Sequence, residues 1–137
     1  MRVSIVNLQH AEPWMIELWY YDIITHKQVK REGMKVNKEN IIIFLNDIKS
    51  ELESDGISKI GLFGSFSRDS ESIYSDIDIA IQKEKGYLVH RTAYDYFDEV
   101  SKIKTIIKKK FHRNIDVFDV DSNSSMLETI KKDLIYV

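Results

Sequence analysis

The chain has 137 residues, of which 43% are hydrophobic and 31% charged, and its formal net charge is -2. This size and composition predict one globular domain, and the small net charge excludes a general attraction to nucleic acid or to a membrane. Because the chain has no cysteine, a disulfide framework and a thiolate metal site are both excluded.

The first segment, residues 1–35, differs from the rest and is expected to be an extension before a domain at residues 36–137. Charged residues interrupt its apolar run, so it predicts neither a signal peptide nor a membrane-spanning helix. Pro13 and Gly33 fit the start and the end of one helix near Glu12–Lys30. We therefore expect a cytoplasmic protein with no membrane partner.

The next segments alternate between a helical and a strand pattern. Apolar residues from Ile41 to Leu52 recur at helical spacing behind Asn37, a residue that suits a helix cap. The run "SKIGLFG" predicts a short strand. In "SDIDIAIQ" the period of two places isoleucines on one face of a second strand and Asp76 and Asp78 on the other.

The last third of the chain predicts a helix, a strand and a closing helix. The expected apolar stripe of the first helix is Ala93, Phe97, Val100, Ile103, Ile107 and Phe111. "NIDVFDV" predicts a third strand, and "SNSSMLETIKKDLIYV" a last helix that closes the chain. The expected fold class is therefore α/β (α+β), a small mixed β-sheet of three or more strands covered by helices.

Asp76 and Asp78 are the first candidate site residues. Two aspartates two positions apart in a strand point the same way, which suits one or two hard divalent cations. Mg²⁺ prefers carboxylate oxygens together with phosphate oxygens from a substrate. On its own the pattern is weak evidence, since the solvent face of any edge strand can carry it.

A Gly-Ser turn, Gly64 and Ser65, directly follows the first predicted strand. Glycine lets the backbone approach a ligand closely, and backbone N–H groups at such a turn suit a phosphate. Arg68 lies nearby in sequence and can donate to phosphate oxygens. Taken singly, these residues fit an ordinary turn capped by serine and a solvent-exposed arginine better than a phosphate site.

The combined stretch "GSFSRDSESIYSDID" resembles the signature of the DNA polymerase beta-like nucleotidyltransferase superfamily: Gly-Ser, ten residues, then Asp-x-Asp. The resemblance covers roughly residues 37–137, and the short C-terminal part is similar to minimal nucleotidyltransferases, the antitoxins paired with HEPN toxins. The third carboxylate of that family falls on Asp116, with Asp119 as the alternative. One position departs from the pattern, because Asp69 stands where the family usually has glycine.

The resemblance implies a metal-dependent enzyme that transfers AMP from ATP to a hydroxyl, usually of a tyrosine, on a partner HEPN ribonuclease toxin. It implies that two Mg²⁺ ions are held by Asp76, Asp78 and Asp116. It also implies that Gly64 and Ser65 bind phosphate, with Arg68 as a weaker candidate. A hetero-oligomer with the toxin is one expected assembly.

Two alternatives stay open at this point. One is a non-catalytic antitoxin or assembly partner that neutralises a toxin by binding, and the other is a nucleotidyltransferase that modifies a small molecule or an RNA end. A basic run would serve the RNA end, but its pattern better fits a solvated helix face. This run consists of Lys102, Lys104, Lys108, Lys109, Lys110, His112 and Arg113.

Overall fold

The computed structural model describes residues 35–137, so the helix expected near Glu12–Lys30 lies outside the described residues. The elements, in chain order, are α2 (Lys38–Ser54), β1 (Ile57–Phe63), α3 (Gly64–Ser67), β2 (Ile77–Lys83), α4 (Tyr87–His90), α5 (Ala93–Phe111), β3 (Ile115–Asp119), α6 (Leu127–Asp133) and β4 (Ile135–Tyr136). Between residues 35 and 137, no helix is both long and apolar enough to cross a membrane.

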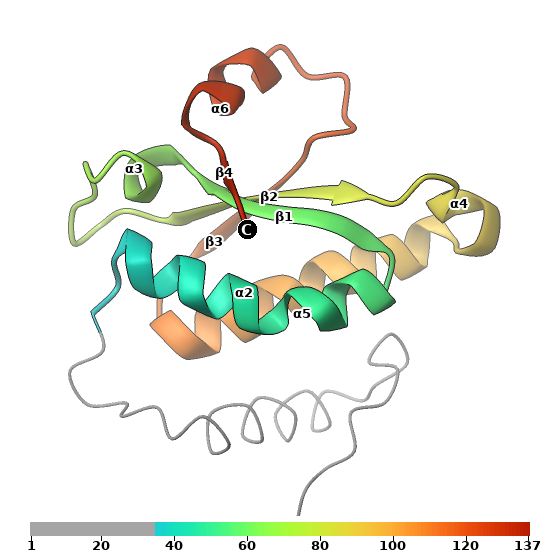
Figure 1. Ribbon diagram of the computed structural model, residues 1–137, viewed down its shortest axis with the longest axis horizontal. Helices are drawn as coiled ribbons and strands as arrows, with labels where there is room; N and C mark the ends of the chain where they lie inside the picture. The colour runs from blue at the N-terminus through green and yellow to red at the C-terminus, as the bar shows by residue number, and fades with distance from the viewer. Residues whose placement is uncertain (1–34) are drawn as a thin grey trace, which may run out of the picture.

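The described strands form one mixed sheet in the order β3-β2-β1-β4. β1 runs antiparallel to β2 and to β4, whereas β2 and β3 are parallel and are joined through α5. Figure 1 shows α2 and α5 side by side along one face of the sheet, with α6 on the opposite side. The predicted fold class, a small mixed sheet with covering helices, is confirmed.

The core lies between the sheet and the two long helices. Ile77, Ile79 and Ile81 are fully buried, as the period of two in β2 predicts. They belong to one cluster with the buried stripe of α2, from Ile41 to Leu52. Asn37 caps α2 by accepting a hydrogen bond from the Asn40 backbone N–H at 2.8 Å, which confirms the expected helix start.

The buried stripe of α5 differs from the predicted one at its N-terminal end. Ala93 and Phe97 are exposed, and the stripe there contains Glu99 and Lys102 instead. Lys102 was expected on a solvated face, but it forms a buried ion pair with Asp55, the residue that caps the end of α2. A counter-ion from another helix therefore makes burial of this lysine possible, and apolar periodicity does not show such a pair.

The C-terminus ends in a strand, so the prediction that a helix closes the chain was wrong. α6 stops at Asp133, and Ile135 and Tyr136 then pair with β1 at its free edge. A Cβ atom on Gly61 would lie 2.7 Å from the Ile135 carbonyl oxygen, so only glycine leaves room for this strand. The β-branched and aromatic residues of "LIYV" also favour an extended backbone over a helix.

Candidate functional site

The Gly-Ser turn lies directly against one of the predicted carboxylates. β1 ends at Phe63, and Gly64 begins α3 with a φ of +76°, a left-handed conformation that favours glycine. A Cβ atom on Gly64 would lie only 2.1 Å from Asp78 Oδ2. The backbone of the turn therefore contacts the Asp78 carboxylate as closely as the absence of a side chain allows.

The three predicted acids lie together at the start of two neighbouring strands. Asp78 of β2 is the register partner of Asp116 in the parallel strand β3, and Asp76 directly precedes β2. Burial and the negative charges of Asp116 and Asp76 together raise the pKa of Asp78 to about 6, against the opposing charge of Arg68. Asp116, Asp76 and Arg68 are therefore close enough to act on the Asp78 carboxylate, as expected of a compact charged site.

Asp119, the alternative third acid, lies apart from this group. It is three residues beyond Asp116 in β3, so its side chain points to the opposite face of the sheet. It forms an ion pair with Lys83 and accepts a hydrogen bond from Tyr96 Oη at 2.8 Å. Burial alone would raise its pKa, but the bonds from Lys83, the Asp121 backbone and Tyr96 keep the pKa below its usual range. Of the two candidates, only Asp116 adjoins Asp78.

Arg68 lies at the end of α3, and α6 fixes its side chain. Its Nη1 atom is 2.6 Å from Asp133 Oδ2, while Ser67 Oγ donates to the Asp133 carbonyl at 2.8 Å. The Arg68 side chain stays half exposed in this ion pair. The C-terminal helix thus holds the turn that carries Gly64 and Ser65.

Asp69, the departure from the family pattern, adopts the backbone conformation that glycine would supply. Its φ is +55°, in the left-handed region where aspartate is one of the few tolerated non-glycine residues. Its carboxylate accepts a hydrogen bond from Lys38 Nζ of α2 at 2.8 Å. The extra negative charge in the motif is therefore paired with a cation outside it.

Arg113 supports the loop before Asp76, a role that its place in the basic run did not indicate. Its Nη1 atom donates to the carbonyls of Ser75 and Ser72, at 2.9 and 3.3 Å. The Asn114 carbonyl also accepts a hydrogen bond from the Ile77 backbone N–H at 2.9 Å. The residues just before β3 thus position the start of β2. This contact joins distant parts of the chain, so the local sequence does not predict it.

The donor set of the site fits a hard divalent cation. Asp76, Asp78 and Asp116 offer only carboxylate oxygens, the ligands that Mg²⁺ prefers. A cation would also relieve the repulsion that, after burial, raises the Asp78 pKa. Within residues 35–137, however, no three His, Asp or Glu side chains already converge as metal ligands. The acids are therefore neighbours whose side chains do not form a finished coordination sphere by themselves.

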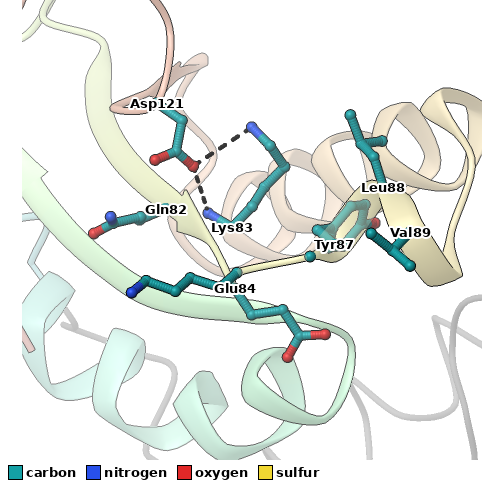
Figure 2. Close-up of a pocket in the computed structure, with 9 residues that line it drawn as sticks. Gln82, Lys83, Glu84, Tyr87, Leu88, Val89 and Asp121 are labelled. Carbon is teal, nitrogen blue, oxygen red and sulfur yellow. Dashed lines mark hydrogen bonds and ion pairs between the residues drawn. The ribbon is translucent and has the colours of Figure 1, made fainter.

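A cavity of about 540 Å³ lies at the other end of β2. It is lined by residues 82–89 and by Asp121, which binds the Lys83 backbone and side chain as Figure 2 shows. None of the predicted site residues lines it. The cavity and the acidic site are therefore separate features of the molecule.

Comparison with known proteins places the chain in a family. A solved structure of a proposed minimal nucleotidyltransferase matches with a TM-score of 0.56 and 19% identity, over 75% of this chain and 98% of that chain. A toxin-antitoxin crystal structure with AMP-PNP matches with a TM-score of 0.48 and 22% identity, over 66% and 69% of the two chains. No curated protein matches. The family model for polymerase beta nucleotidyltransferases matches residues 46–136, more than half of the chain, and the protein therefore belongs to this family.

Proposed function

We propose that the protein transfers AMP from ATP to a tyrosine hydroxyl of a partner HEPN ribonuclease toxin and thereby acts as its antitoxin. The observation that carries the transfer step is the juxtaposition of the Gly64 turn with Asp78, whose register partner is Asp116. A phosphate-binding turn beside a group of carboxylates suits a nucleoside triphosphate together with its cations. The nature of the acceptor follows the resemblance of the motif to the minimal nucleotidyltransferases.

The reaction has a simple balance. The acceptor oxygen attacks the α-phosphorus of ATP, the bond from the α-phosphorus to its bridging oxygen breaks, and pyrophosphate leaves with the electron pair. Asp116, exposed on the edge strand β3, takes up the proton of the acceptor hydroxyl. The backbone at Gly64 and Ser65 holds the terminal phosphates, and Arg68 adds a positive charge beside them.

Asp76, Asp78 and Asp116 would hold the divalent cations. When bound, these cations would neutralise the triphosphate and the developing charge on the α-phosphoryl group. Catalysis of this kind depends on positioning and electrostatics, so the loss of two ligands should cost about 100-fold or more.

Two observations weigh against the alternatives. The ion pair of Asp69 with Lys38 removes the feature that most favoured a non-catalytic antitoxin. Lys102 is buried and Arg113 is bound to loop carbonyls, so the basic run is less available to an RNA end than its sequence implies. We therefore propose a catalytic antitoxin whose acceptor is a protein.

The test combines the full chain with labelled ATP, Mg²⁺ and the protein encoded by the adjacent gene, followed by mass spectrometry of both chains. A gain of one AMP on a tyrosine of the neighbour is expected. The double variant Asp76→Asn with Asp78→Asn should lose this transfer while its circular dichroism spectrum stays unchanged. Asp98→Asn, which removes an exposed acid of α5, is the matched control and should transfer normally.

Undiminished transfer by the double variant would refute the mechanism. Neutralisation of the toxin without ATP or Mg²⁺ would instead support inhibition by contact alone. Labelling of RNA or of a small molecule, with none on the protein, would move the acceptor to another class.

A further inference from the structure

Arg113, in the short connection between α5 and β3, contacts two of the segments that carry candidate site residues. Its Nη1 atom donates to the Ser75 and Ser72 carbonyls, at 2.9 and 3.3 Å. Its Cζ atom lies 5.7 Å from the centre of the Phe66 ring, within the range of a cation-π contact. Phe66 is buried in α3, the helix of the Gly-Ser turn, and Ser75 directly precedes Asp76. One side chain therefore contacts both the helix of the turn and the loop before the first acid.

Asp76 lies just outside the sheet, because β2 begins at Ile77, and the Asp76 side chain is exposed. The backbone on each side of Asp76 is bonded to the same short segment before β3. The Ser75 carbonyl accepts a hydrogen bond from Arg113, and the Ile77 N–H donates to the Asn114 carbonyl at 2.9 Å. Two consecutive residues, Arg113 and Asn114, therefore fix the backbone from which the Asp76 carboxylate extends.

The segment that holds Asp76 also leads directly to the third acid. Asp116 lies three residues after Arg113, and its register partner in β2 is Asp78. Loss of the Arg113 contacts would therefore let Asp76 move relative to both of the other acids. Mg²⁺ demands near-ideal octahedral geometry, so a displacement of about 0.5 Å in one carboxylate is enough to weaken its binding.

We propose that Arg113 is a positioning residue for the candidate cation site, where it fixes the Asp76 carboxylate beside Asp78 and Asp116 and so sets the affinity for a divalent cation. The inference rests on the proposed function, because it concerns the same three acids as cation ligands.

The sign of the effect separates positioning from charge. Arg113 carries a positive charge one contact away from Asp76, so its charge by itself opposes the binding of a cation. If charge were its whole influence, removal of the guanidinium would strengthen cation binding. Positioning predicts the opposite result, a weaker site.

The first test measures binding of Mn²⁺ to the full chain without ATP, by electron paramagnetic resonance of the free ion. Mn²⁺ is the probe because it accepts the same oxygen ligands as Mg²⁺ and is paramagnetic. R113Q should weaken this binding roughly tenfold or more, the usual cost of losing a group that orients a metal ligand. R113K keeps the charge but loses the planar fork of donors, so it should weaken binding by about threefold.

The matched control is K85Q, which also removes one positive charge, from an exposed residue just beyond the other end of β2. It should bind Mn²⁺ like the unmodified chain. Circular dichroism and urea unfolding of each variant report whether the fold is kept. If R113Q does not fold, R113K is compared with K85Q in its place.

A double-mutant cycle with D76N tests whether Arg113 acts through Asp76. Once the Asp76 ligand is gone, R113Q should weaken Mn²⁺ binding little further, whereas a general structural effect would weaken both backgrounds equally. In the transfer assay, R113Q should raise the Mg²⁺ concentration for half-maximal transfer roughly tenfold and largely recover its rate at saturating Mg²⁺.

Several results would overturn the inference: unaltered or tighter Mn²⁺ binding by R113Q, an equal loss in K85Q, or equal losses from R113Q with and without Asp76. No Mn²⁺ binding by the unmodified chain at millimolar concentration would remove the cation site and the inference with it. Mn²⁺ binding that depends on Arg113, without any transfer, would refute only the proposed function. Transfer by R113Q with an unaltered Mg²⁺ dependence would refute only the role of Arg113.

Discussion

Glu99 offers a test of the electrostatics inside the fold, because it is a carboxyl group buried to 1% exposure beside Lys102 and Asp55. Burial and the negative charge of Asp55 raise its pKa to about 8, against the opposing charge of Lys102. Lys102 already pairs with Asp55, so a neutral Glu99 leaves the cluster without net charge. We therefore expect Glu99 to be protonated in the folded protein at pH 7.

The sign of the pH dependence follows from this raised pKa. Below pH 4.5, Glu99 is protonated in both the folded and the unfolded chain, so its full contribution to stability is present. As pH rises from 4.5 to about 8, the unfolded chain gives up the proton and the folded chain keeps it, which destabilises the fold. Each pH unit in this window lowers the free energy of unfolding by up to about 1.4 kcal/mol.

The variant Glu99→Gln removes this pH dependence, because glutamine has nearly the same shape and cannot ionise. Relative to the unmodified chain, the variant should gain roughly 2 kcal/mol between pH 5.5 and 7.5. Urea unfolding at pH 5.5, 6.5 and 7.5 measures the difference, with the exposed Glu128→Gln as control. A difference that does not change with pH, or one that falls at higher pH, would show that Glu99 is ionised and paired with Lys102.

Three further predictions concern the Gly-Ser turn and the residues that hold it. Gly64→Ala should lower the free energy of unfolding by about 2 kcal/mol or more, because its φ is +76° and the new Cβ would overlap Asp78; a loss below 0.5 kcal/mol in urea unfolding would contradict this. Asp69→Gly should change stability by less than about 1 kcal/mol and leave transfer intact, since its ion pair with α2 is exposed; a large loss of transfer would assign the carboxylate a direct role. Asp133→Asn should raise the KM for ATP about threefold or more with stability nearly unchanged, because Arg68 loses the partner that orients it; an unaltered KM would exclude that role.

Most of the sheet could be predicted from the sequence, because β1, β2 and β3 carry the alternation or the apolar content of buried strands. β4 could not, since a strand of two residues depends on the space that Gly61 leaves for it. The buried polar end of α5 was also missed. Apolar periodicity predicts that Glu99 and Lys102 lie on the surface. It gives no information about Asp55, the counter-ion at the end of α2 that pairs with Lys102.

The register of the sheet decides which acid, Asp116 or Asp119, lies beside Asp78. Both acids lie on one five-residue strand, and in the sequence only the flanking Ile115 and Val117 favour Asp116 over Asp119. Parallel pairing with β2 places Asp116 beside Asp78, and the alternation of side chains sends Asp119 to the face where Lys83 and Tyr96 lie. Sequence can therefore name the candidate acids, whereas their grouping is a property of the fold.

The same logic explains the unusual residue of the motif. The position of Asp69 requires a left-handed backbone, which explains a preference for glycine there and also why aspartate is tolerated. Conformation alone would still leave a negative charge next to the turn that we propose to bind phosphates. Lys38, one residue after the cap of α2, binds this carboxylate from an element far away in sequence. The substitution and its compensating cation therefore form one unit, which we expect to be compatible with a nucleotide at Gly64 and Ser65.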